Sequence, residues 1–185
     1  MSTQRWMVVC LAAMAACGPG GCATYVNVPA QSGDVAQNDP NYETVTQVEA
    51  TAVMAVLQDK PVPGLVTLDL PAGTRPEGYQ TVIKGLPEGV TAEKAEGRPV
   101  VSVRQVRVRG WYAQADVVHP GTRADDPPHL VTVSMRWEWF KGWQPQHLKH
   151  WRIPVDDALK QSRVEAEHEI NPNAPEPNKE AGNPN

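Results

Sequence analysis

Apolar residues recur at helical spacing in two segments of the first half of the chain. In residues 40–58 they fall three or four positions apart, at Val45, Val48, Ala52 and Val56. The polar residues of the segment lie mostly outside this stripe and include Glu43, Gln47, Glu49 and Gln58. In residues 74–86, Thr74 and Glu77 have the spacing of a capping box, and Gly85 and Pro87 mark the end of the segment. The spacing therefore predicts helices over 40–58 and 74–86.

Alternation of apolar and polar residues replaces the helical spacing from residue 99 onward. Residues 99–118 alternate between apolar and polar, and the alternation shifts by one position near Gln105 and again near Gly110. This pattern predicts one long strand, bent or bulged at these points. Residues 131–139 alternate without interruption and give the clearest strand signal. After a turn that glycine and proline permit, we expect residues 147–155 to return as a third antiparallel strand.

The order of these elements predicts an α+β domain. Two or three short helices, the last a weak one over 155–168, would pack on one face of a curved antiparallel sheet of three to four strands. A short alternating run at 65–70 adds a further strand. The outline resembles cystatin-like and nuclear-transport-factor-like cones, in which a bent sheet wraps a helix. This resemblance implies a pocket in the concave side of the sheet.

The N-terminal segment is typical of an exported protein. Arg5 provides a positive charge, and Trp6–Ala16 has no polar side chain, as in the apolar region of a signal peptide. A helix of this length is too short for the hydrocarbon core of a bilayer, which is about 30 Å thick. The segment therefore predicts export rather than a permanent transmembrane anchor.

A cysteine closes this apolar segment in a pattern that resembles the lipobox of bacterial lipoproteins. The residues are Met14-Ala15-Ala16-Cys17, and a second candidate follows at Gly20-Gly21-Cys22. In lipoproteins the cysteine is acylated and becomes the new N-terminus, so the resemblance implies lipidation at Cys17, with Cys22 as the alternative. It also implies a lipid-anchored protein of the cell envelope, on the outer membrane or a periplasm-facing membrane. An ordinary cleaved secretory peptide is the competing interpretation.

Composition divides the chain into four parts. Residues 1–16 are the expected signal peptide, and the small and polar residues 17–38 are the expected lipidated cysteine with a flexible tether. Residues 39–165 would form the single α+β domain, and the proline-rich residues 166–185 a disordered tail. The sequence has no cysteine beyond Cys22, so we expect no disulfide in the domain.

Charge and motifs narrow the class of function. The formal net charge is −4 and the pI is about 5.7, so the sequence lacks the basic character typical of nucleic-acid-binding proteins. The mature sequence contains no nucleophile elbow, zinc-protease motif or P-loop, and no cysteine nucleophile in the domain. We therefore expect no cofactor and no nucleic-acid partner, assign no catalytic residue, and favour a binding role over an enzyme.

Five of the six tryptophans lie beyond residue 110. Trp137 and Trp139 alternate with polar residues, so we expect both on the core face of their strand. Trp143 and Trp151 lie near a turn and in the returning strand, where the pattern fits exposure and burial equally. With Arg152 they form a candidate binding surface for a glycan or partner protein, because tryptophan combines a large apolar face with an N–H donor.

Two pairs of histidines are candidates for metal binding or catalysis. His147 and His150 would face opposite sides of a strand and supply only two ligands, so we expect no metal site. His119 and His129 flank an acidic loop, which we interpret as solvated in preference to a site at the neck of the loop.

Three classes of function remain open. The favoured one is a membrane-anchored envelope lipoprotein that acts as a binding or scaffold module, with the membrane and an envelope protein or glycan as partners. The second is a small-ligand-binding or enzymatic domain with a cone-like pocket. Arg107 and Arg109, which would share a strand face, could contact an anion or simply face solvent. The third is glycan or cell-wall binding through exposed tryptophans.

Overall fold

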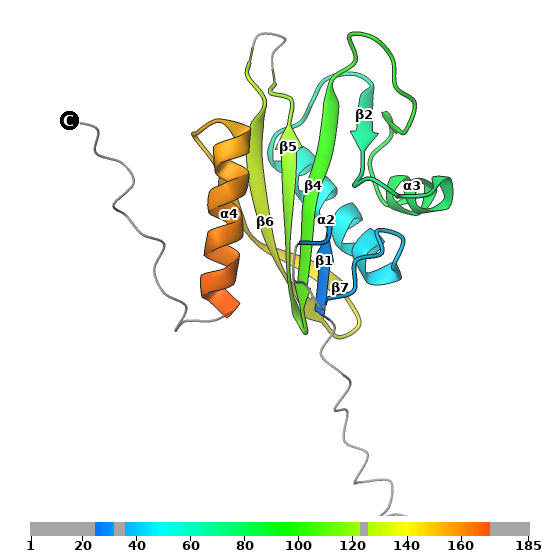
Figure 1. Ribbon diagram of the computed structural model, residues 1–185. Coiled ribbons are helices and arrows are strands. Elements are labelled where there is room, and N and C mark those ends of the chain that lie inside the picture. Colours follow the sequence, from blue (N-terminus) through cyan, green and yellow to red (C-terminus); the bar gives the residue numbers. More distant parts are fainter. Residues whose placement is uncertain (1–24, 32–35, 123–125, 171–185) are drawn as a thin grey trace, which may run out of the picture.

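The computed structural model describes residues 25–31, 36–122 and 126–170. The expected signal peptide, both candidate lipidation cysteines and residues 171–185 of the expected tail lie outside these ranges. The described chain forms three helices and a seven-stranded sheet (Figure 1). In chain order the elements are β1 (Tyr25–Val28), α2 (Glu43–Asp59), β2 (Val66–Asp69), α3 (Pro76–Lys84), β3 (Val90–Thr91), β4 (Val100–Arg109), β5 (Tyr112–His119), β6 (His129–Glu138), β7 (Gly142–His150) and α4 (Val155–Ile170).

The sheet is mixed and has more strands than the sequence pattern predicts. Its order is β3-β2-β4-β5-β6-β7, and β1 also pairs with β4. β2 is parallel to β3 and to β4, whereas the other pairs are antiparallel. One edge of β4 is shared, because β2 pairs with the start of this strand and β1 with its end. The α+β class is confirmed, but the expected three to four strands and the purely antiparallel sheet are wrong.

The segment 99–118 is a hairpin rather than one bent strand. Arg109 of β4 pairs with Tyr112 of β5, which leaves Gly110 and Trp111 as a two-residue turn. The register shift beside Gln105 is the bulge that the first shift in alternation predicts. The second shift marks the turn, where Gly110 has a φ of 59°, as the first central position of a tight hairpin turn requires. A bulge and a turn both shift the alternation of apolar and polar residues by one position, so the sequence pattern could not distinguish them.

Element boundaries differ from expectation at three other places. β7 begins at Gly142 rather than at residue 147, because the chain reverses within the short segment 139–141. β1 lies inside the expected tether 17–38, where its backbone joins the ladder of β4. α4 runs to Ile170, beyond the expected domain end at residue 165.

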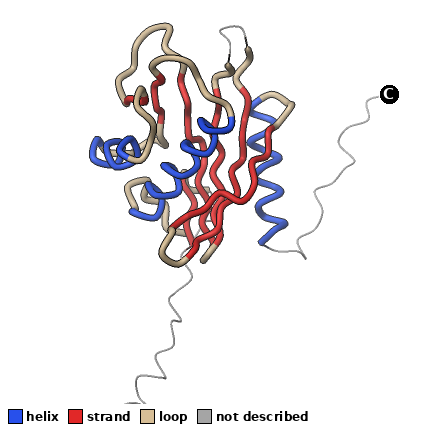
Figure 2. Tube along the Cα trace, turned by 180° about the vertical axis from the view of Figure 1, so that it is seen from behind, coloured by secondary structure: helices blue, strands red, loops and turns tan. Residues whose placement is uncertain are grey.

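The helices cover both faces of the sheet, so the expectation that they share one face is wrong. Figures 1 and 2 show α2 on one face and α4 on the other. Val117 and Val131 pair across β5 and β6 and belong to the valine-rich core that contains α2. The neighbouring pair, Asp116 and Thr132, points the other way and hydrogen-bonds with Ser162 of α4. Strand alternation thus gives the sheet a valine-rich face under α2 and a face of mixed polarity under α4, where Asp116 and Thr132 lie beside a smaller apolar cluster that includes Leu130.

Candidate functional site

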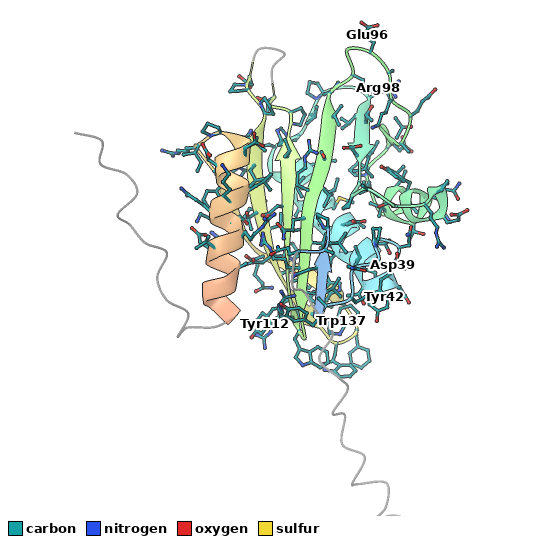
Figure 3. The ribbon with its side chains drawn as sticks, viewed as in Figure 1. Asp39, Tyr42, Glu96, Arg98, Tyr112 and Trp137 are labelled. Atoms are coloured by element: carbon teal, nitrogen blue, oxygen red, sulfur yellow. The ribbon has the colours of Figure 1, made fainter. Side chains whose placement is uncertain are left out.

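The two hairpin turns place four aromatic side chains at one end of the sheet. Trp111 lies in the turn between β4 and β5, and Tyr112 is the first residue of β5. Trp139 and Phe140 belong to the turn between β6 and β7. The rings of Trp111 and Trp139 contact each other across the turns, with centroids 5.7 Å apart. Figure 3 labels Tyr112, and the neighbouring Trp137, at this end. We call Trp111, Tyr112, Trp139 and Phe140 the aromatic tip.

The aromatic tip is exposed on all four of its side chains. The exposed fractions are 53% for Trp111, 60% for Tyr112, 71% for Trp139 and 104% for Phe140. Exposed apolar residues on a soluble surface are usually scattered singly, whereas a contiguous patch marks contact with a partner or a membrane. The tip is therefore a candidate interaction surface.

Phe140 is fully exposed, and its backbone has a conformation that glycine or asparagine adopts more easily. It is the single phenylalanine of the sequence, and its φ is 69°. It occupies the third position of a turn closed by a hydrogen bond of 3.2 Å from the Lys141 N–H to the Glu138 carbonyl, where glycine or asparagine is usual. The left-handed conformation costs an ordinary residue about 1–2 kcal/mol. Neither packing nor local conformation therefore explains a phenylalanine at this position.

Positive charges flank the aromatic tip. The guanidinium of Arg136 lies 5.8 Å from the ring centroid of Tyr112. The side chain of Lys141 is 68% exposed and pairs at 3.0 Å with Glu138, the one carboxylate within residues 109–112 and 136–141. Arg109 immediately precedes the first turn. The two turns and their flanks thus carry more positive than negative charge.

The N-terminal strand begins at the same end of the sheet. Tyr25, the first residue of β1, pairs with Arg109, whose guanidinium carbon lies 3.3 Å from the centroid of the Tyr25 ring. Arg109 also donates a hydrogen bond of 3.0 Å from Nη2 to the side-chain oxygen of Asn27. Since Gly110 and Trp111 follow Arg109 directly, the described chain starts beside the aromatic tip.

The candidate surface formed by Trp143, Trp151 and Arg152 is not present. Trp143 is 6% exposed and packs edge-on against Trp137, with ring centroids 5.5 Å apart. Trp151 is 7% exposed and directs its indole N–H into a buried network, so that Arg152 alone is exposed. The expected core position also fails for Trp139, whereas Trp137 does pack against the core. Burial of the two indoles removes the basis for glycan binding at Trp143 and Trp151.

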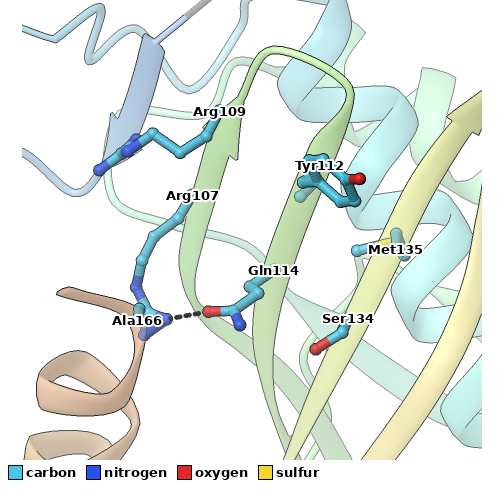
Figure 4. A pocket seen from close by; sticks show the side chains of 8 residues that line it. Arg107, Arg109, Tyr112, Gln114, Ser134, Met135 and Ala166 are labelled. Atoms are coloured by element: carbon cyan, nitrogen blue, oxygen red, sulfur yellow. Dashed lines mark hydrogen bonds between the residues drawn. The ribbon is translucent and has the colours of Figure 1, made fainter. Parts of the chain in front are cut away.

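A pocket of about 410 Å³ opens on the face of the sheet that α4 covers (Figure 4). β4, β5, β6 and the last part of α4 line this pocket, and Arg107 donates a hydrogen bond of 3.1 Å to the side-chain oxygen of Gln114 there. The lining includes Arg107 and Arg109 but no histidine, cysteine, aspartate or glutamate. The exposed lining is mainly apolar, with a smaller share of polar groups, so it favours binding of a small, largely apolar ligand over acid–base or nucleophilic catalysis.

A buried polar network ties α4 to the sheet beside this pocket. Asp116 is fully buried and accepts hydrogen bonds from Arg107 Nη2, from the hydroxyl of Thr132 at 2.6 Å and from that of Ser162 at 2.7 Å. The Trp151 indole donates to the Thr132 hydroxyl at 2.9 Å. Because Arg107 is paired with a buried carboxylate, its main role is structural and its charge is largely balanced within the domain.

Three histidines form a row at the opposite end of the sheet. His119, His129 and His150 have successive ring centroids 5.1 Å and 5.7 Å apart. The Gly121 N–H donates to Nδ1 of His119, so Nε2 carries the hydrogen and donates to the Lys60 carbonyl at 2.9 Å. Burial lowers the pKa of His119, and burial with the nearby charge of Lys60 lowers the pKa of His129 to about 4. His119 is fully buried and His129 partly buried, so the two histidines do not belong to a solvated loop as the sequence analysis expected.

Comparison with protein-family models, curated proteins and solved structures finds no match for this chain. Within the described ranges, no helix is long and apolar enough to cross a bilayer, and no group of three histidine, cysteine, aspartate or glutamate residues is placed to hold a metal ion. The fold and site together define an α+β domain with an exposed aromatic tip and a pocket beside α4.

Sequence analysis did not find the aromatic tip, although two signals in the sequence pointed to it. Gly110 comes directly before Trp111 and Tyr112, and Gly142 follows closely after Trp139 and Phe140. Glycines beside aromatic residues at a break in alternation mark turns, and turns lie on the surface.

Proposed function

We propose that this chain is a lipid-anchored protein of the bacterial cell envelope, whose domain acts as a binding or scaffold module close to the membrane. The apolar segment Trp6–Ala16, followed by Cys17 and Cys22, supports export and acylation. The observation that carries the proposal is the position of β1. Tyr25 lies three residues after Cys22 and starts the sheet beside the aromatic tip.

The short distance along the chain limits how far the domain can stand from its anchor. An extended chain spans at most about 3.5 Å per residue, so acylation at Cys22 would hold Tyr25 within about 10 Å of the lipid attachment. Acylation at Cys17 would extend this reach to about 28 Å. In both cases the end of the sheet that carries the aromatic tip would be the end tied to the membrane.

Metabolic labelling with an alkyne fatty acid in a bacterial host that processes lipoproteins tests the anchor. We expect the wild-type chain to take up the label and to fractionate with membranes, and the double variant Cys17→Ser/Cys22→Ser to lose both properties. The two single variants show which cysteine is acylated. Cys10→Ser is the matched control, since Cys10 lies inside the apolar segment and should not affect labelling. A double variant that keeps the label refutes the lipid anchor.

A second candidate function, supported by the pocket, is the binding of a small, mainly apolar ligand that carries an anionic group. Calorimetric titration with small carboxylates and phosphates tests it. Ser134→Phe should abolish binding by filling the pocket, whereas Gln146→Phe, on an exposed position of the neighbouring strand, should not. Heats that Ser134→Phe leaves unchanged, or no heat with any anion, would argue against this function.

A further inference from the structure

We propose that the aromatic tip binds the surface of a lipid bilayer, so that the domain contacts the membrane through its two hairpin turns as well as through the N-terminal lipid. The orientation of the domain in this proposal rests on the proposed lipid anchor, whereas the affinity of the tip for lipid is a property of the described residues alone. The proposal is built from the composition of the tip, its flanking charges and its position relative to β1.

The composition of the tip suits the interface between lipid headgroups and hydrocarbon. Tryptophan and tyrosine are enriched there, because their rings are largely apolar while the indole N–H or phenol hydroxyl still reaches water or headgroups. The tip supplies Trp111, Tyr112 and Trp139 in this role. Phe140 adds a fully exposed ring with no polar group, which would reach deepest among the acyl chains.

Phe140 also shows that the tip is not organised for the stability of the folded domain. A glycine would relieve the positive φ of 69°, and a polar residue would avoid exposing a ring to water. A residue that is unfavourable for both local conformation and solvation marks a functional position. A membrane surface supplies the apolar surroundings that this ring lacks in water.

The charges beside the tip complement an anionic bilayer. Arg136 and Lys141 flank the second turn, where Glu138 is the one carboxylate within residues 136–141. Arg109, at the first turn, is already held by contacts with two residues of β1. Basic side chains near a bilayer are attracted to anionic headgroups. These charges therefore add an electrostatic attraction to the apolar contact that the tip makes with an anionic surface.

The position of β1 distinguishes a membrane from other occupants of the tip. Tyr25 pairs with Arg109, one residue before the turn, and the chain outside the described ranges leaves from Tyr25 toward the candidate lipidation sites. A tether of three to eight residues brings this end of the sheet close to the bilayer. A second copy of the chain or a partner protein would have to occupy a surface already directed at lipid.

Vesicle flotation tests the proposal with the chain from residue 23 to residue 185. This chain keeps every described residue and lacks both the apolar segment and the candidate lipidation cysteines. We expect it to float with vesicles of phosphatidylethanolamine and phosphatidylglycerol, and we expect brominated phospholipid to quench its tryptophan fluorescence. Trp139→Ser/Phe140→Gly should lower the partition coefficient at least about tenfold, because burial of one large apolar side chain already favours transfer by about this factor.

The matched control removes apolar surface from the opposite end of the sheet. Leu65 and Val100 are 57% and 42% exposed and lie near the starts of the parallel strands β2 and β4, whereas the tip lies at the end of β4. Leu65→Ser/Val100→Ser should leave vesicle binding unchanged. Equal losses in the two double variants would overturn the proposal, since binding would then follow general surface hydrophobicity.

The single variant Phe140→Gly separates a membrane role from a structural one. We expect its thermal unfolding midpoint to equal or exceed that of the wild type, because glycine accepts the positive φ, while its vesicle binding falls. A lowered midpoint together with unchanged vesicle binding would assign Phe140 to the fold and overturn its proposed role.

Two further outcomes would overturn the proposal. The first is a dimer in sedimentation that Trp139→Ser/Phe140→Gly dissociates, in a chain that does not float with vesicles, because the tip would then bind a second copy. Flotation that requires phosphatidylglycerol but is insensitive to this double variant would show an ionic contact without the tip. Vesicle binding without fatty-acid labelling would support the membrane-binding role of the tip and refute the lipid anchor. Labelling without vesicle binding would support the lipid anchor and refute the membrane-binding role of the tip.

Discussion

Glu49 offers the sharpest test of the energetics of this fold. It lies in the middle of α2, its side chain is fully buried, and neither carboxylate oxygen has a hydrogen-bond partner among the described residues. Burial raises the pKa of this carboxyl from 4.5 to about 8. Near neutral pH the folded domain therefore holds a protonated, uncharged carboxylic acid in its core.

The raised pKa makes the stability of the domain depend on pH. The folded state binds more protons than the unfolded state between about pH 4.5 and pH 8, so the free energy of unfolding falls as pH rises through this range. The contribution of Glu49 is fully present below about pH 4.5. At about 1.4 kcal/mol per pKa unit, the loss is about 3 kcal/mol at pH 7 and approaches about 5 kcal/mol above pH 8.

Urea unfolding of the wild type and of Glu49→Gln measures this loss, since glutamine has a similar shape and does not titrate. We expect the stability of Glu49→Gln, relative to wild type, to increase by about 3 kcal/mol between about pH 5 and pH 8. Glu43→Gln is the matched control, because it makes the same substitution at an exposed position of the same helix. A pH dependence shared by wild type and Glu49→Gln would refute the reasoning.

Two further predictions concern the other buried polar groups. The lowered pKa of His129, about 4 in the folded state against 6.5 when unfolded, means that its contribution to stability is present above about pH 6.5 and is lost as pH falls toward 4. His129→Gln should therefore flatten the acid side of the profile of thermal midpoint against pH, and an unaltered acid side would contradict this assignment. Asp116→Ala should destabilise the domain by about 3–5 kcal/mol in urea unfolding, because Arg107 loses its buried carboxylate partner. The double variant Arg107→Met/Asp116→Leu should recover much of this loss, and equal instability of the single and double variants would show that the ion pair is not the cause.

The periodic elements of the chain followed from its sequence. Apolar spacing predicted a helix over 40–58, where α2 spans Glu43–Asp59, and alternation predicted a strand over 131–139, where β6 spans His129–Glu138. The apolar spacing did not predict the burial of Glu49, which lies next to Val48 of the apolar stripe in the sequence. The sheet contacts α2 through four strands, so a wider part of the helix is buried than one stripe indicates.

Sequence by itself determined the period of the longer segments, and hence their type, because period depends on residues that are close along the chain. The short strands β1 and β3 have too few residues to show a period. Only the tertiary structure decided which faces became core and which side chains met. Trp143 and Trp151 are buried because α2 and α4 cover opposite faces of the sheet, and Trp139 is exposed because the chain turns at that residue. The aromatic tip likewise exists because the pairing of β5 with β6 aligns two turns that are distant in sequence. Long-range pairing of this kind leaves no local period, so it could not be deduced from the sequence pattern.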